Sequence, residues 1–187
     1  MTKLAKKPGG WGAVRKELAT WEKPALLALL KDLYAAVGAS RDFIRARSRA
    51  GESDDEALET YRGKIVEQFF PARGLGKLKL GEARKAIRDY RKATGNVAGT
   101  AELLMTYVET GTEFTLDFGD IGERFYSSVE SALDELAALL RGEARGVYRQ
   151  FSDRLAEVEE MASGIGWGFH DFVGDVVGQL EEELGGR

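Results

Sequence analysis

The amino-acid sequence predicts an all-α fold, an irregular single-domain bundle of about nine helices. Apolar residues recur at intervals of three and four through most of the 187 residues, and this spacing places them on one face of a helix. Glycines, prolines and capping residues divide the pattern into segments of ordinary helix length. Alternation of apolar and polar residues, which is typical of a half-buried strand, occurs only briefly, in the glycine-rich segment 71–81.

The first three helices are predicted within residues 11–49. Residues 1–10 are basic and have no apolar periodicity, so we expect a flexible tail ahead of one helical domain over 11–187. Helical spacing then links Trp11, Val14, Leu18 and Trp21. A second helix begins near Pro24 and carries a wide apolar stripe of Leu26, Leu27, Leu30, Leu33, Tyr34 and Val37. Ser40 caps a third helix, which contains Phe43 and Ile44.

Two longer helices are predicted over 52–69 and 80–93. The first begins with acidic residues, which favour the positive end of the helix dipole, and it ends before Pro71. Its apolar face comprises Leu58, Tyr61, Ile65 and Phe69. The second helix is the clearest amphipathic segment of the chain, because its apolar and basic residues occupy opposite halves of the helix. Its apolar stripe comprises Leu80, Ala83, Ile87 and Tyr90.

Four more helices are predicted after a break at residues 94–96. Their apolar stripes begin at Val97, Phe125, Val147 and Trp167. Gly111 lies on the first of these stripes, where a glycine costs about 1 kcal/mol relative to alanine, and this indicates the close approach of another backbone. We expect the sixth and ninth helices of the chain to be central in the bundle.

Composition excludes several classes of protein. The chain has no cysteine, which removes disulfides, thiolate zinc sites and cysteine nucleophiles, and which fits a reducing cytoplasm. No apolar run approaches the roughly 18 residues needed to cross a bilayer, so we expect no membrane association. The net charge of −4 is unevenly distributed, with +2 over 1–59, +7 over 60–96 and −13 over 97–187.

The basic helix 80–93 is the strongest candidate for a binding surface. A one-sided basic face can neutralise the phosphates of a nucleic acid and release counterions. The competing interpretation is a solvated face that the acidic C-terminal half neutralises, in the same chain or in a second subunit. The residues concerned are Arg84, Lys85, Arg88, Arg91 and Lys92.

Acidic residues around the only histidine are candidates for a metal or catalytic site. Glu109, Glu113 and Asp117 are spaced four apart, so they share a helix face. The metal candidates are Glu113, Asp117 and Asp120, and the catalytic candidates are Glu109, Glu113, His170 and Asp171. An exposed acidic face compensated by Arg124, Arg141 or water is the alternative. A lone histidine limits enzymatic schemes, and no kinase, EF-hand or P-loop motif is complete.

Two segments combine glycines with aromatic residues, YVETGTEFTLDFGDIGERFY (107–126) and SGIGWGFHD (163–171). Trp167, Phe169 and Tyr126 are candidates to line a small-molecule pocket, and core packing is the competing interpretation. In either case we expect the two segments to lie together. The aromatic side chains Phe114, Phe118, Phe125 and Tyr126 are then predicted to pack near Trp167 and Phe169.

Five stretches of the chain resemble a bacterial family of compact domains of unknown function. They are LLALLKDLY (26–34), FFPARG (69–74), LGEARKAIRDYRK (80–92), YVETGTEFTLDFGDIGERFYSSVES (107–131) and SGIGWGFHD (163–171). The resemblance extends over most of the chain, from about residue 14 to 184. It implies a mostly helical domain and carries over no catalytic residue, because the family has none assigned.

These observations lead to one functional expectation and two alternatives. We expect a cytoplasmic, non-enzymatic binding or scaffolding module that acts through a protein partner or through self-association, without a cofactor. The first alternative is a nucleic-acid-binding protein that uses the basic helix 80–93. The second is a metal-dependent enzyme at the acidic cluster.

Overall fold

The computed structural model describes residues 10–51 and 55–186, and over these residues the chain is helical without any strand. The all-α prediction is confirmed. The predicted tail, apart from Gly10, and the predicted helix start at 52–54 lie outside the described residues. The α-helices are α1 (Trp11–Leu18), α2 (Lys23–Ala36), α3 (Gly38–Ser48), α4 (Asp55–Phe69), α5 (Leu80–Thr94), α6 (Val97–Phe118), α7 (Glu123–Arg141), α8 (Ser152–Ala162) and α9 (Phe169–Leu180).

The chain divides into two compact units, residues 1–44 and 45–187, with the division inside α3. We call their described parts the N-terminal unit (10–44) and the C-terminal unit (45–51 and 55–186). The prediction of one helical domain over 11–187 stays a prediction. None of the described helices combines the length and the apolar content that a bilayer crossing needs.

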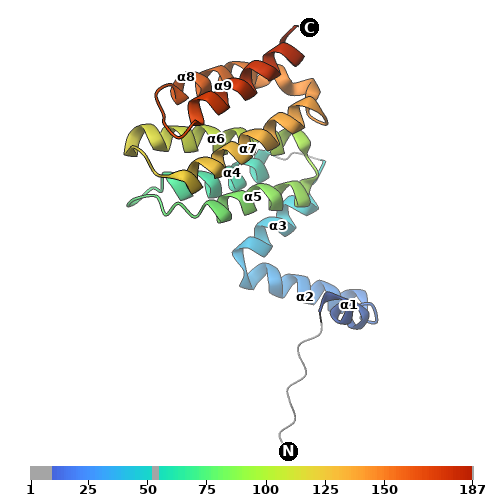
Figure 1. Cartoon of the computed structure of the whole chain (residues 1–187). Coiled ribbons are helices and arrows are strands. Elements are labelled where there is room, and N and C mark those ends of the chain that lie inside the picture. Colours follow the sequence, from blue (N-terminus) through green and yellow to red (C-terminus); the bar gives the residue numbers. More distant parts are fainter. Residues whose placement is uncertain (1–9, 52–54, 187) are drawn as a thin grey trace, which may run out of the picture. The chain divides into compact units, whose positions relative to one another are not determined.

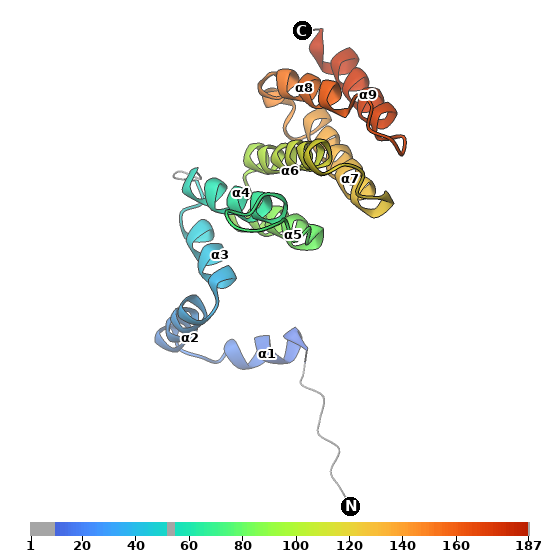
Figure 2. The same cartoon turned by 90° about the vertical axis from the view of Figure 1, so that its left-hand side faces the viewer.

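The C-terminal unit is built from three pairs of neighbouring helices. α4 packs against α5, α6 against α7, and α8 against α9. Figures 1 and 2 show these pairs as three layers, with α6 and α7 in the middle. Contacts of α6 with α4 and with α8 connect the first helices of the pairs, and contacts of α7 with α9 connect second helices. The unit is therefore a stack of helical pairs, the plan on which α-solenoids are also built.

α6 is the central helix, as predicted. It contacts α4, α5, α7 and α8, and 14 of its 22 residues are buried, so it has no continuous polar face. Asn96 caps its first turn by accepting a hydrogen bond from the Gly99 amide at 2.8 Å. Its five buried threonines each donate to the carbonyl four residues earlier, which satisfies their hydroxyls inside the helix: Thr100, Thr106, Thr110, Thr112 and Thr115.

The prediction that the ninth helix is central is wrong. α9 packs against α7 and α8 in an outer layer. Its apolar residues line one face, whereas Asp171, Asp175 and Gln179 recur every four residues on the opposite face and are exposed. An amphipathic helix of this kind has one face to bury, so it covers a core from outside.

Two local predictions also need correction. Residues Arg145–Gln150 form a 3₁₀ helix before α8, where one continuous helix from Val147 was predicted. In a 3₁₀ helix the side chains at i and i+3 eclipse, and Tyr148 and Phe151 are thereby both buried. At Gly111, the close neighbour is the Val129 side chain of α7, whose Cγ2 would lie 2.7 Å from an added Cβ, and not another backbone.

The N-terminal unit has no core of its own. No residue between 10 and 44 is buried, and α1 and α2 are not among the extensively packed helix pairs. The corner between α2 and α3 is fixed by Arg41, which donates to the carbonyls of Tyr34 and Ala35 at 3.2 and 3.3 Å and lies over the Tyr34 ring. The helices of this unit therefore keep their apolar stripes accessible.

Candidate interaction surfaces

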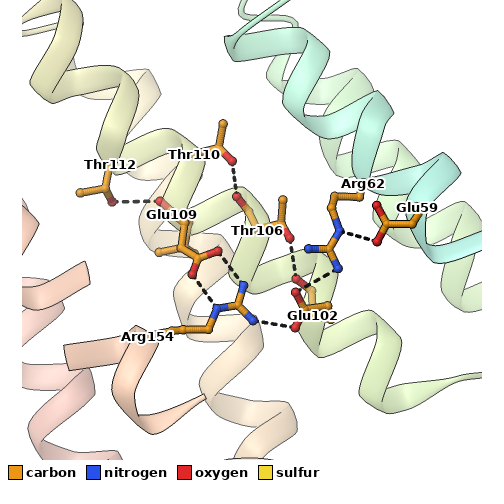
Figure 3. Close-up of polar contacts among 9 residues, drawn as sticks. Glu59, Arg62, Glu102, Thr106, Glu109, Thr110, Thr112 and Arg154 are labelled. Atoms are coloured by element: carbon orange, nitrogen blue, oxygen red, sulfur yellow. Dashed lines mark hydrogen bonds and ion pairs between the residues drawn. The ribbon is translucent and has the colours of Figure 1, made fainter. Parts of the chain in front are cut away.

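A row of charged side chains crosses the first helices of the three pairs (Figure 3). Arg62 of α4 contacts Glu102 of α6 at 3.1 Å. Glu102 also accepts from Arg154 of α8 at 2.7 Å. The same guanidinium also donates two hydrogen bonds of 2.7 Å to the carboxylate oxygens of Glu109. Glu109 follows Glu102 on α6 by about two helical turns. This bidentate geometry is the strongest form of an arginine–carboxylate pair.

The row is partly shielded from water. The side chains of Glu102, Glu109 and Arg154 are 21%, 27% and 28% exposed. The hydrogen bond with Glu109 raises the pKa of Arg154 above its usual range, although burial opposes the shift. Each of these charges has a partner within the row, so the arrangement ties helices together and presents no free acid, base or nucleophile.

A second row joins the other helices of the pairs. Arg84 of α5 donates to Glu135 of α7 at 2.6 Å, and Arg91 contacts Glu143, just after α7, at 3.0 Å. Arg141 at the end of α7 pairs with Glu183 after α9 at 2.9 Å. Two of the predicted nucleic-acid contacts, Arg84 and Arg91, are thus matched by acids from the C-terminal half, as the competing interpretation requires.

The remaining basic residues of α5 make no ion pair with another helix among the described residues. Lys85 pairs with Asp89 of the same helix. Arg88 and Lys92 are exposed, and neither makes an ion pair with another described residue. The nucleic-acid alternative therefore rests on two unmatched cations, fewer than the five that the sequence suggested.

Binding of short DNA and RNA at low salt tests this alternative. Because each neutralised phosphate adds about 0.9 to the salt slope on duplex DNA, two free cations predict a slope near two, with binding lost at physiological salt. Fluorescence anisotropy of the wild type and of an Arg88→Glu, Lys92→Glu variant measures it. A steep salt dependence that the variant abolishes would restore the nucleic-acid alternative.

The acidic candidates do not converge. Glu109 is paired with Arg154, Glu113 and Asp117 are exposed on α6, and His170 and Asp171 are exposed in the first turn of α9. No three His, Asp or Glu side chains in the described part of the chain are placed to share a metal ion. The metal-dependent enzyme alternative receives no support from this geometry.

The two segments rich in glycine and aromatic residues do lie together, as predicted. The rings of Tyr126 and Phe169 are 5.5 Å apart, and the Trp167 indole N–H donates to Asp120 at 2.7 Å. Phe114, Phe118 and Phe125 instead surround Phe69, the last residue of α4, and Phe70, which follows it. Burial is the largest cause that raises the pKa of Tyr126.

Trp167 is not packed in a pocket. Its side chain is 61% exposed, and its backbone has φ +61°, a left-handed conformation that is uncommon outside glycine. An open pocket of about 370 Å³ is lined instead by Leu78, Leu80 and residues 121–125, which precede Tyr126 in the chain. Trp167, Phe169 and Tyr126 as the lining of a ligand pocket stay a prediction.

The N-terminal unit carries most of the exposed apolar surface. Of the eleven large apolar side chains exposed in the described chain, seven belong to this unit: Trp11, Val14, Trp21, Leu27, Leu30, Leu33 and Val37. Together with the half-buried Leu18, Leu26 and Tyr34 they make up the stripes predicted from the sequence. We call this set the apolar stripe. Seven large apolar side chains exposed within residues 10–44 depart from the scattered single exposures that are normal on a protein surface.

Some of the residues that organise the structure were not predicted. Arg154, Glu102 and Arg62 were absent from the candidates, although Glu102 and Glu109 are seven residues apart and so share a face of α6. That spacing is the one signal in the sequence that points to a shared cation. Comparisons of the chain with family models, curated proteins and solved structures give no match. The family resemblance described above therefore stays a prediction.

Proposed function

We propose that this protein is a non-enzymatic, cytoplasmic binding or scaffolding module that acts through protein–protein association at the apolar stripe. The observation that carries the proposal is the exposure of most of that stripe, on two helices that contain no buried residue. An isolated helix of 14 residues is marginal in water. Helices such as α1 and α2 gain stability when their apolar faces are covered by a partner.

The C-terminal unit supports a scaffolding role. Its three helical pairs share a continuous core around α6, and ion pairs join neighbouring pairs along both rows. Such a body holds its surface in a fixed geometry. The absence of cysteine from the sequence is compatible with a reducing compartment, which supports the cytoplasmic assignment.

Site-specific photo-cross-linking tests the proposal. A photoreactive amino acid replaces Leu33 on the apolar stripe, or Ala28 on the opposite face of α2, in cells of the source organism that produce the chain at its normal level. Both positions are exposed, so the pair is matched for access. We expect a discrete protein adduct from position 33 and none from position 28. Equal labelling from the two positions, or none from either, would contradict association through the stripe.

A further inference from the structure

From the apolar stripe we infer that its partner is a second copy of this chain, and that α1 and α2 of two copies pair around a two-fold axis. The inference rests on the proposed function, because it names the partner of the same surface. Spacing, the distribution of exposed apolar residues, size and charge each support it.

The spacing of the stripe is that of helices that pack lengthwise on other helices. Leu26, Leu30 and Leu33 follow one another within α2 at intervals of four and three, and Trp11, Val14 and Leu18 follow within α1 at three and four. Trp21 and Val37 continue these intervals just beyond the ends of the two helices. Alternating intervals of three and four define the buried positions of coiled coils and bundles.

The stripe on α2 is too wide for one partner helix. Leu27, Leu29 and Tyr34 flank the central positions, and apolar flanks of this kind are typical of a helix that faces two or more neighbours in a bundle. One chain supplies α1 and α2, neither of which has a buried residue. Two chains supply four such helices, and an isologous interface buries the same surface of both.

The complementary apolar surface is on the N-terminal unit itself. Outside it, the exposed large apolar residues of the described chain are Leu75, Leu116, Phe118 and Trp167. They belong to the segment between α4 and α5, the end of α6, and the segment before α9. They lie in or beside the connections within the three helical pairs, which share one end of the stack (Figure 1). Such a group of residues does not match a stripe that runs along helices, whereas a second N-terminal unit carries the same stripe.

Size and charge are compatible with such a dimer. The apolar stripe comprises ten residues of each copy, which form the apolar centre of the 20–30 residues that each side of a standard interface uses. Residues 10–44 carry five basic and four acidic side chains, so two copies repel each other little. Residues 45–187 carry a net charge of −8, and pairing through that unit would oppose two like-charged surfaces.

Light scattering coupled to gel filtration measures the mass of the full chain. The stripe variant is Leu30→Glu with Leu33→Glu, and the matched control is Ala28→Glu with Ala35→Glu, which adds the same charge to the opposite exposed face of α2. We expect a dimer for the wild type and the control. In the stripe variant the dissociation constant rises roughly 100-fold or more. Circular dichroism melting of all three proteins confirms that the C-terminal unit remains folded.

Because the chain has no cysteine, single cysteines locate the contact. Leu27→Cys, Leu30→Cys and Leu33→Cys are oxidised separately, beside Ala28→Cys. A disulfide-linked dimer from at least one stripe position, with none from position 28, supports pairing of the two N-terminal units. A dimer that none of the stripe cysteines links would overturn it, as would a stripe variant that stays dimeric.

The two proposals fail differently. Suppose that the wild type is monomeric at roughly 100 µM and still gives a photo-adduct with another protein from position 33. This result overturns the inference that the partner is a second copy, and it supports the proposal that the protein associates through the apolar stripe. A monomer without any adduct overturns both. An adduct with the mass of two chains supports both.

Discussion

Replacing Arg154 by methionine is expected to lower the free energy of unfolding by about 2 kcal/mol. The substitution leaves the carboxylates of Glu102 and Glu109 without their shared cation, in surroundings that exclude about three-quarters of their solvent contact. Removing one partner of a fully buried pair costs about 3–5 kcal/mol. Screening by the remaining solvent reduces that figure here. Urea denaturation of the purified chain measures the difference.

The matched control is Arg91→Met. Arg91 makes one contact, with Glu143, and the two side chains are 40% and 62% exposed, so its loss is expected to cost less than about 0.5 kcal/mol. Adding Glu109→Gln to Arg154→Met should restore part of the lost stability, because the carboxylate that lost its cation is then removed, whereas Glu102 keeps its ion pair with Arg62. Equal losses from Arg154→Met and Arg91→Met would show that the row across α4, α6 and α8 contributes no more than a surface pair.

The ion pairs explain the uneven charge of the sequence. The basic stretch 60–96 comprises most of α4 and all of α5, and the acidic stretch 97–187 contains α6 to α9. Arg62, Arg84 and Arg91 of the basic stretch all pair with acids of the next layer. The charge asymmetry suggested either nucleic-acid binding or internal neutralisation, and three of the ten basic residues in 60–96 are neutralised by the next layer.

Patterns confined to one helix were predictable from the sequence. The buried apolar faces of α5 and α7 were predicted from residue spacing alone. Ile87, Tyr90, Val129 and Leu133 are buried as expected. The partners of charged residues were not, because Arg154 is 45 residues from Glu109 and no local rule relates them. The left-handed backbone at Trp167 was likewise missed, because the ninth helix was predicted to begin at that residue and apolar spacing carries no information about a positive φ.

The N-terminal unit shows a different limit of sequence reasoning. Periodicity identified the apolar faces of α1 and α2 correctly, and those faces were assumed to join a common core. Spacing specifies which side of a helix is apolar, but it carries no information about what covers that side. Leu27, Leu30 and Leu33 are about half exposed, and a helix whose partner is another chain has the same sequence pattern as one buried in its own core.

Gly99→Ala is expected to lower the free energy of unfolding by about 2 kcal/mol. An added Cβ would lie 2.1 Å from the Tyr90 hydroxyl oxygen and 2.8 and 2.9 Å from two ring carbons. Tyr90 is fully buried and packs edge-on against Tyr61 at 5.7 Å, so its rigid ring has nowhere to move. Overpacking costs about 1–3 kcal/mol, and an approach of 2.1 Å places this site at the upper end of that range. Subtracting the roughly 1 kcal/mol that alanine gains over glycine in a helix leaves a net loss of about 2 kcal/mol.

Gly81→Ala separates these two effects. Gly81 is the second residue of α5 as Gly99 is the third of α6, and nothing lies within 4 Å of a Cβ added there. Only the helix-propensity gain remains, so thermal or urea unfolding should show equal or slightly greater stability, by up to about 1 kcal/mol. In a Gly99→Ala, Tyr90→Phe protein the nearest clashing atom is gone but the ring carbons stay. The double variant is therefore expected to lose less free energy of unfolding than the sum of the losses in the two single variants. Strict additivity would show that the cost of Gly99→Ala does not arise from its contact with Tyr90.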